Sequence, residues 1–234
     1  MNRSIPLHDS ECWLFDLDNT LYPASNGLMA EVSSRMTLFV AQVLGVAADE
    51  ALVEQKQLYR KHGTTLRGLM DEYAVDPWSF LDFVHQVDYG QVDPSPRLAE
   101  ALLALPGRKI VFTNASTKHA ERVLDRLGVA HYFEGVFDVA AASWQPKPHP
   151  TAYQTLVERH QITPARSVMV EDIAPNLEPA AALGMTTVWL RHHDATAPAW
   201  TTPGEASDYV HHKIGNLIEW LGSLSASQSQ PLDR

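Results

Sequence analysis

The segment CWLFDLDNT, residues 12–20, joins an uninterrupted apolar run to a pair of aspartates. An apolar run without polar alternation is typical of a strand buried on both faces of a parallel sheet. Because side chains alternate along a strand, Asp16 and Asp18 are expected to point to the same side where that strand ends. Two like charges at one place need a shared cation or proton. The alternative is that one aspartate caps the next turn and the other is solvated.

Four further short apolar runs follow, at residues 109–113, 135–139, 167–170 and 186–190. Helical patterns separate them at residues 118–127, 151–160 and 175–183. Strands that alternate with helices predict an α/β fold, with a doubly wound, mostly parallel, Rossmann-like sheet.

About ninety residues separate the first run from the second, and their pattern is helical throughout. The amphipathic stretches are residues 27–44, 49–61, 66–73 and 78–85. Since a crossover between parallel strands needs only one helix, the excess predicts a helical domain inserted at residues 27–92. The core domain then comprises residues 1–26 and 93–222, and the polar, small-residue segment 223–234 is expected to be a flexible tail.

Composition excludes several classes of protein. The 234 residues are 45% hydrophobic, which is enough for a substantial core, and 18 basic against 28 acidic residues give a net charge of −10. This balance argues against a nucleic-acid polymer or a membrane surface as partner. A single cysteine, Cys12, excludes an internal disulfide. Without an apolar span or a signal peptide near residue 1, a cytoplasmic protein is expected.

Polar residues also follow the later apolar runs. Thr113-Asn114 ends the second run, Lys147 stands between two prolines after the third, and Glu171-Asp172 ends the fourth, with Asn176 close behind. Ligands of open α/β sheets bind at the carboxyl ends of the strands, and paired carboxylates suit Mg²⁺. Each signal also has a simpler structural interpretation. Thr113-Asn114 is also typical of a helix N-cap, Lys147 of a surface lysine, and Glu171-Asp172 of acids at a helix N-terminus. Together, in chain order, they are a strong signal, because four successive strand ends offer a carboxylate pair, a hydroxyl, a lysine and a second carboxylate pair.

The set resembles the haloacid dehalogenase-like (HAD) superfamily of phosphohydrolases, in which the insertion corresponds to a C1 helical cap. The matching motifs are DLDNT (16–20), Thr113-Asn114, Lys147, and Glu171-Asp172 with Asn176. By this resemblance Asp16 is the nucleophile that forms an aspartyl-phosphate, and Asp18 is the general acid and base. Thr113, the backbone N–H of Asn114 and Lys147 bind the phosphoryl oxygens.

The resemblance also implies a Mg²⁺ ion held by the Asp16 carboxylate, the Asp18 carbonyl and Asp172. Glu171 and Asn176 surround this ion and orient Lys147 and metal-bound water. The dehalogenating members lack a carboxylate at the position of Asp18, so the motif favours a phosphatase. A β-phosphoglucomutase-like phosphotransferase stays open, and a non-catalytic interaction domain is disfavoured because no motif residue is missing.

Several segments look more specifically like the pyrimidine 5′-nucleotidase branch of this superfamily. They are FDLDNTLYP (15–23), HGTTLRGL (62–69), His85 with VDY (87–89), and FTNA (112–115) with His119-Ala120. The resemblance implies hydrolysis of nucleoside monophosphates such as UMP or CMP by a monomer or homodimer. A sugar-phosphate or phosphoglycolate phosphatase is the alternative within the same class.

Residues 60–67 of the insertion are a candidate clamp for the polar end of the substrate. Residues 28–95 contain ten acids and five bases, yet three of those bases fall in this short stretch without an acid among them. The candidate contacts are Arg60, His62, Gly63, Thr64, Thr65 and Arg67. An ordinary charged helix end is the competing interpretation. Aromatic candidates for stacking on a base are Tyr59, Tyr73, Trp78, Phe83 and Tyr89, with Trp144 as a candidate lid; all of these are also typical of a small core.

Overall fold

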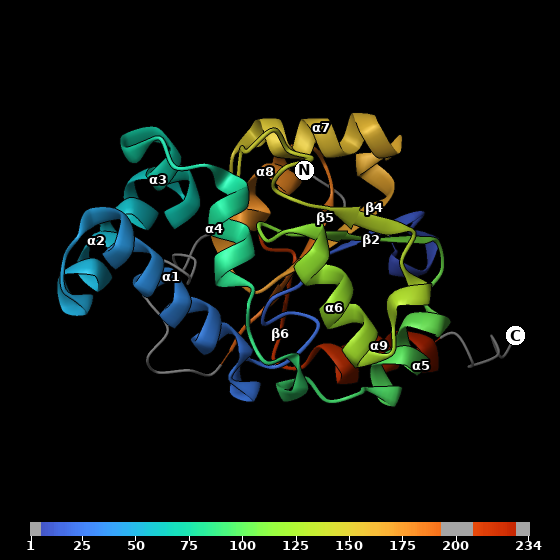
Figure 1. The fold of residues 1–234 in the computed structure, drawn as a ribbon. Helices are drawn as coiled ribbons and strands as arrows, with labels where there is room; N and C mark the ends of the chain where they lie inside the picture. Colours follow the sequence, from blue (N-terminus) through green and yellow to red (C-terminus); the bar gives the residue numbers. More distant parts are fainter. Residues whose placement is uncertain (1–5, 193–207, 228–234) are drawn as a thin grey trace, which may run out of the picture.

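The computed structural model describes residues 6–192 and 208–227. Within these ranges the chain forms one sheet of six strands in the order β3-β2-β1-β4-β5-β6, and every neighbouring pair is parallel (Figure 1). The strands are β1 (Cys12–Phe15), β2 (Arg108–Phe112), β3 (Gly135–Phe137), β4 (Ser167–Glu171), β5 (Thr186–Leu190) and β6 (His212–Ile214). The predicted α/β, doubly wound, Rossmann-like class is confirmed.

Strand β1 lies in the middle of the sheet, between β2 and β4, and it is buried on both faces. Trp13 and Phe15 face one apolar cluster, whereas Cys12 and Leu14 face another. This division explains the apolar run without alternation, because successive side chains each meet a layer of helices.

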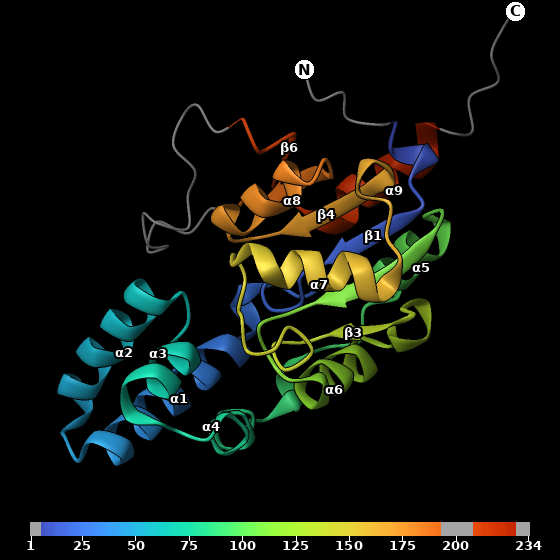
Figure 2. The same ribbon diagram turned by 90° about the horizontal axis from the view of Figure 1, so that it is seen from above.

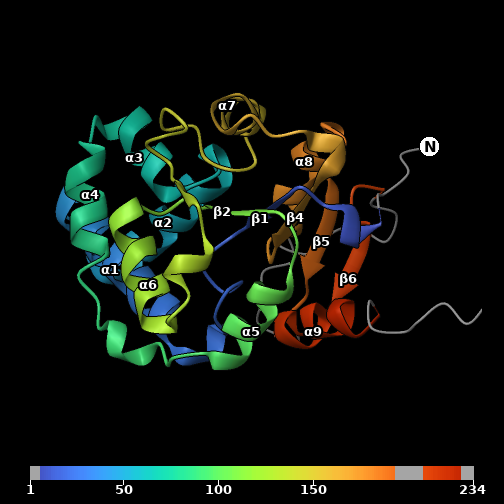
Figure 3. The same ribbon diagram turned by 90° about the vertical axis from the view of Figure 1, so that its right-hand side faces the viewer.

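Helices cover both faces of the sheet, as Figures 1 and 3 show. One face packs against α5 (Pro96–Ala104), α6 (Thr117–Leu127) and α9 (Leu217–Ser227). The other packs against α7 (Pro150–His160) and α8 (Glu178–Ala182). Short 3₁₀ helices occupy Leu7–Asp9, Ala24–Asn26, Tyr89–Gln91, Ala130–Tyr132, Pro164–Arg166 and Ala174–Leu177.

The long connection between β1 and β2 contains α1 (Leu28–Leu44), α2 (Ala48–His62), α3 (Thr65–Tyr73) and α4 (Pro77–Val84). These helices gather beside the ends to which the strand arrows point (Figure 2). They enclose an apolar cluster of their own that includes Val40, Leu58, Leu69 and Phe80. A separate core supports the predicted inserted domain at residues 27–92, although its boundaries stay a prediction.

Among the described helices, none is both long and apolar enough to cross a membrane alone. Helices α1 and α2 pass that test only as a pair, by length and composition, and they meet at a bend of 102°.

Three elements differ from the pattern expected from the sequence. Helix α5 is not among the expected helices, and it begins at Pro96, since the first turn of a helix tolerates a residue without an N–H group. Strand β6 is short and half-exposed, so it carries little apolar signal. Residues 223–227, expected in the flexible tail, belong to α9, and the rest of that segment lies outside the described residues.

Candidate active site

The carboxyl ends of β1, β2 and β4 lie side by side because these strands are neighbours in the sheet. The ladder continues just past β1, where the backbone N–H of Asp16 donates to the carbonyl of Val170 at 2.9 Å. The backbone N–H of Thr113 likewise donates to the carbonyl of Phe137 at 3.0 Å. Asp16 and Thr113 therefore stand at one edge of the sheet, which is where ligands of open α/β sheets bind.

Lys147 joins this edge from the loop after β3, and its side chain is buried. Its Nζ atom donates to Oδ1 of Asp16 at 2.6 Å, to Oε2 of Glu171 at 2.6 Å and to the carbonyl of Phe112 at 2.8 Å. Burial alone would lower the pKa of Lys147, but the two carboxylates raise it above its ordinary value. Lys147 is consequently a fixed positive charge beside Asp16.

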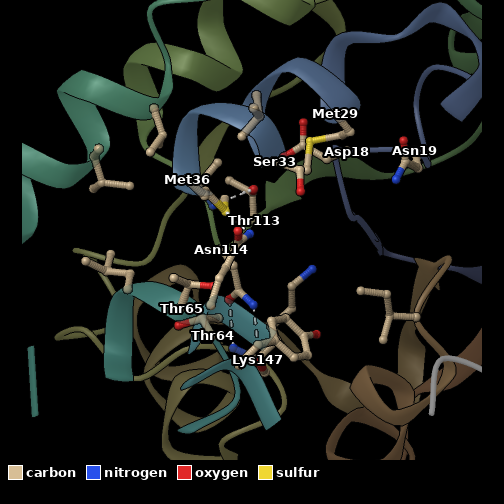
Figure 4. A pocket seen from close by; sticks show the side chains of 18 of the residues that line it. Asp18, Asn19, Met29, Ser33, Met36, Thr64, Thr65, Thr113, Asn114 and Lys147 are labelled. Carbon is tan, nitrogen blue, oxygen red and sulfur yellow. Dashed lines mark hydrogen bonds between the residues drawn. The ribbon is translucent and has the colours of Figure 1, made fainter. Parts of the chain in front are cut away.

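Asn114 holds the loop that carries Lys147. The side chain of Asn114 accepts a hydrogen bond from the backbone N–H of Lys147 at 2.7 Å and donates to its carbonyl at 3.2 Å (Figure 4). Thr113 is buried beside it, and its Oγ1 accepts from the N–H of Ala115 at 2.9 Å. The side chain of Asn114 thus positions the backbone of Lys147.

Three carboxylates converge next to Lys147. One carboxylate oxygen from each of Asp16, Glu171 and Asp172 lies within 4.8 Å of the others. Burial, followed by the charge of Glu171, raises the pKa of Asp16 to about 7, and burial with the same neighbour raises the pKa of Asp172. Acids that resist ionisation in this way form a favourable site for a hard cation with oxygen ligands.

Glu171 uses both of its oxygens within the protein. Oε2 accepts from Lys147, and Oε1 accepts from the backbone N–H of Ile173 at 3.1 Å. Asn176 is buried nearby and lines the same cavity. Glu171 therefore orients Lys147, and Asp16 and Asp172 are left as the better placed ligands for a cation.

Asp18 lies in a different environment from Asp16. Its Oδ1 accepts from the hydroxyl of Tyr22 at 2.6 Å and lies 2.9 Å from Nε2 of His119. Burial would raise the pKa of Asp18, but its interactions with His119 and Tyr22 lower it below the ordinary value. The two aspartates of the motif thus have pKa values displaced in opposite directions, as expected for groups with different roles.

His119 connects Asp18 to the inserted helices. Its side chain is fully buried, its Nδ1 lies 3.0 Å from the hydroxyl of Tyr89, and its ring stacks on that of His85 at 4.3 Å. His85 ends α4 and lies 3.1 Å from Oγ of Ser116, and burial followed by the charge of His119 lowers its pKa to about 3. The sequence motifs included His119, but not its role as the partner of Asp18, which lies 101 positions away in the chain.

A cavity of about 560 Å³ lies between the strand ends and the inserted helices. Asp16, Asp18, Thr113, Asn114 and Lys147 line its floor. Figure 4 shows Met29, Ser33 and Met36 of α1 facing Lys147, Thr64 and Thr65 across this space. The remaining wall is mostly apolar and includes Val32, Leu66, Phe80, Leu81 and Val84.

Only part of the 60–67 segment faces this cavity. Arg60, Thr64 and Thr65 line it, and Oγ1 of Thr64 caps α3 by accepting from the N–H of Arg67 at 3.1 Å. His62, Gly63 and Arg67 are not among the lining residues.

Acids of α3 neutralise the other positive side chains of this segment. Arg67 pairs with Asp71 at 2.7 Å, and His62 lies 3.1 Å from Asp71 and 2.6 Å from Glu72. Lys61 also pairs with Glu72, at 2.7 Å. Two of the three bases of the segment, Lys61 and Arg67, are therefore paired with acids of α3.

The aromatic candidates are also divided. Tyr59 lines the cavity, whereas Tyr73, Trp78, Phe83 and Tyr89 do not. Trp144 lies outside the cavity wall and meets Trp78 edge to face at 5.0 Å, so this pair joins the inserted helices to the core.

Comparison with known proteins places these features in a family. Residues 11–184 match the model of the haloacid dehalogenase-like hydrolases. Glyceraldehyde 3-phosphate phosphatase of Pyrococcus furiosus is 25% identical over 92% of this chain and 95% of its own length. Phosphate metabolism protein 8 of Saccharomyces cerevisiae is 27% identical over 74% of this chain, but the match spans only 59% of the yeast protein.

Solved structures agree with the fold. A HAD phosphatase from Thermococcus onnurineus superposes with a TM-score of 0.62 at 18% identity, over 94% of this chain and 98% of the other. The family model covers most of the sheet and all of the strand-end residues described above. The chain therefore belongs to the haloacid dehalogenase-like hydrolases, and it has phosphatases among its relatives.

Proposed function

We propose that this protein is a Mg²⁺-dependent phosphomonoester hydrolase that forms an aspartyl-phosphate on Asp16 and acts on pyrimidine nucleoside 5′-monophosphates. The observation that carries the proposal is the pair Asp16 and Asp18 at the end of β1. Asp16 is held by a buried lysine, while Asp18 is held by a histidine and a tyrosine. Paired carboxylates with separate environments are suited to a nucleophile and an acid–base catalyst.

In the first step, an oxygen of Asp16 attacks phosphorus, and the bond between phosphorus and the ester oxygen breaks. Asp18 acts here from its protonated form, which is the minor form because His119 and Tyr22 lower its pKa; it donates that proton to the leaving oxygen, so the alcohol departs neutral. Lys147 and the N–H of Asn114 receive the phosphoryl oxygens. Lys147 also lowers the repulsion between Asp16 and the incoming dianion, because its ammonium lies 2.6 Å from the carboxylate.

In the second step, water attacks the phosphorus of the aspartyl-phosphate and transfers a proton to Asp18. The acyl phosphate bond breaks, Asp16 regains its carboxylate, and inorganic phosphate leaves. The interactions that lower the pKa of Asp18 support this step, because they keep Asp18 in the ionised form that accepts the proton.

The donor set around Asp16 fits a divalent cation. Asp16 and Asp172, with the main-chain carbonyl of Asp18, would hold it, while Glu171 stays with Lys147 and Asn176 lies alongside. A bound Mg²⁺ would supply charge neutralisation for the phosphoryl dianion and the crowded carboxylates.

The cavity supports a nucleotide over a smaller ester. A volume of about 560 Å³ exceeds what a three-carbon or two-carbon phosphate ester fills, and apolar residues such as Met36 and Phe80 in its lining offer surface to a flat base. The runner-up is a sugar-phosphate or phosphoglycolate phosphatase, which is favoured by relatives of those names, including phosphoglycolate phosphatase of Vibrio cholerae at 28% identity over 60% of this chain and 62% of its own length.

A substrate panel tests the proposal. Phosphate release from 5′-UMP, 5′-CMP, glyceraldehyde 3-phosphate, phosphoglycolate and ribose 5-phosphate is measured with Mg²⁺ and with EDTA, beside Asp16→Asn. We expect Mg²⁺-dependent release that is fastest for the pyrimidine nucleotides and absent in the variant. Equal or faster release from phosphoglycolate or glyceraldehyde 3-phosphate would reject the nucleotide assignment, and release by Asp16→Asn would reject the mechanism.

A further inference from the structure

Gln55 is a buried polar residue among the cavity-lining residues of the inserted helices. It lies on α2, is 8% exposed, and lines the same cavity as the catalytic carboxylates. Gln55 precedes Tyr59 by about one turn of α2, which places it about 6 Å closer to the N-terminal end of that helix. A ligand whose phosphate sits by Asp16 would reach Gln55 with its far end.

The contacts of the Gln55 side-chain amide distinguish its oxygen from its nitrogen. Oε1 of Gln55 lies 2.5 Å from Oγ1 of Thr37, a length typical of O–H···O bonds and shorter than N–H···O bonds, which begin at about 2.7 Å. The other amide atom faces the thioether sulfur of Met36 at 3.8 Å, and that sulfur accepts hydrogen bonds but donates none. The hydroxyl of Thr37 also has the carbonyl of Ser33 within reach, at 3.2 Å, but the much shorter contact assigns its proton to Oε1 of Gln55. The Nε2 group is then the amide atom that faces Met36, a residue of the cavity lining.

The Nε2 group has a poor partner. Within the described part of the chain it donates to the sulfur of Met36, a weak acceptor, although an amide nitrogen carries two N–H groups. A buried donor without a good acceptor costs free energy, and a ligand that supplies a carbonyl recovers it.

We propose that Gln55 determines specificity by donating from Nε2 to a ring carbonyl of the nucleobase. This inference rests on the proposed nucleotide substrate and adds the group that reads the base. Met36 and Phe80 line the same wall and offer apolar faces to a flat ring. A polyol at this position would have the Nε2 group of Gln55 for one hydroxyl and would bury others against a thioether and an aromatic ring.

The fixed orientation of the Gln55 amide also determines which nucleobases the site accepts. Because Oε1 is already used by Thr37, Gln55 presents donors only. Uracil and cytosine both carry the 2-carbonyl that such a donor needs, whereas adenine has no carbonyl. We therefore expect UMP and CMP to be accepted similarly and AMP to be disfavoured, since a site built to hydrogen-bond a substrate group rejects the analogue that lacks it.

Gln55→Leu tests the contact, with Gln57→Leu as its control on the exposed side of the same helix. kcat and KM are measured for UMP, CMP, AMP and ribose 5-phosphate, which has no base. In Gln55→Leu the ratio of kcat/KM for UMP to that for ribose 5-phosphate should fall about tenfold, mainly through KM. Gln57→Leu should keep the wild-type ratio. An unchanged ratio in Gln55→Leu would overturn the inference.

Thr37→Val gives a second, independent test, because it removes the hydroxyl that orients the amide while keeping its shape. The freed amide can turn its oxygen to the cavity, so the preference for UMP over AMP should narrow without loss of folding. A preference that stays at the wild-type value contradicts the orienting role. A wild-type enzyme that does not prefer UMP to ribose 5-phosphate would reject the proposal of a nucleotide substrate. A wild-type preference for UMP that both variants keep would reject only the proposed role of Gln55.

Discussion

The ammonium of Lys147 lies 2.6 Å from Oδ1 of Asp16, and the side chains of both residues are almost fully buried. The same ammonium contacts Glu171 at an equal distance, so one positive charge is shared by two buried carboxylates. Such a group contributes to stability as well as to catalysis, because removing it leaves buried charges without a partner.

Lys147→Met should therefore destabilise the protein as well as inactivate it. The expected loss is about 3–5 kcal/mol in the free energy of unfolding at neutral pH without Mg²⁺, the range for breaking a buried ion pair. Urea unfolding followed by circular dichroism measures it. Lys118→Met is the matched control, since Lys118 pairs with Asp82 on the exposed surface, where a change below about 0.5 kcal/mol is expected. Equal losses in the two variants would contradict the buried ion pair.

Asp172→Asn should raise the melting temperature in the absence of metal and remove the stabilisation by Mg²⁺. In EDTA the variant should melt at a higher temperature than the wild type, because one of three mutually repelling carboxylates is gone. Mg²⁺ should raise the melting temperature of the wild type and leave that of the variant nearly unchanged, since a ligand stabilises only the fold that binds it. Thermal unfolding with EDTA and with Mg²⁺ gives both comparisons, and an equal Mg²⁺-induced shift in the two proteins would exclude Asp172 as a ligand.

Asp18→Asn should separate catalysis from metal binding. The amide keeps the main-chain carbonyl but cannot transfer a proton, so turnover of UMP should fall by about 10² or more while the Mg²⁺-induced thermal shift persists. A loss of Mg²⁺ response as complete as that of Asp172→Asn would contradict the proposed division of roles.

His119→Ala should affect esters according to their leaving groups. His119 holds Asp18 through a 2.9 Å contact but does not itself line the cavity, so it is a positioning residue. Hydrolysis of UMP, whose leaving oxygen needs a proton, should lose at least about tenfold in kcat. p-Nitrophenyl phosphate, which releases a stable phenolate, should lose much less. His131→Ala, at an exposed site, is the control; a uniform loss for both esters in His119→Ala would point to a general structural role.

The sequence predicted the chemistry at the strand ends better than the contacts that tune it. The apolar run of β1 and the Asp16-Asp18 spacing are local, and so they could be recognised directly. His119 and Gln55 could not be assigned roles in the same way, because their partners come from distant segments brought together by folding. The charge of the 60–67 segment was visible in the sequence, but the pairing of Lys61 with Glu72 depends on the turn that folds α3 back beside α2.

His85 should make the protein sensitive to acid. Its folded pKa of about 3 lies below the ordinary value near 6.5, so between these values the unfolded chain binds a proton that the folded protein does not. Stability then falls as pH decreases from 6.5, by up to about 1.4 kcal/mol per pH unit from this group. Urea unfolding at several pH values should show a shallower acid loss for His85→Gln than for wild type, and parallel curves would refute the assignment.

Chemical trapping of the intermediate tests the central claim most directly. The enzyme is mixed with UMP and Mg²⁺ and treated with sodium borohydride, which reduces an aspartyl-phosphate to homoserine, and the peptide containing residues 12–20 is sequenced by mass spectrometry. We predict homoserine at position 16, dependent on both UMP and Mg²⁺ and absent in Asp16→Asn. Active turnover of UMP with an unmodified Asp16, or with homoserine at another aspartate, would contradict the proposed mechanism.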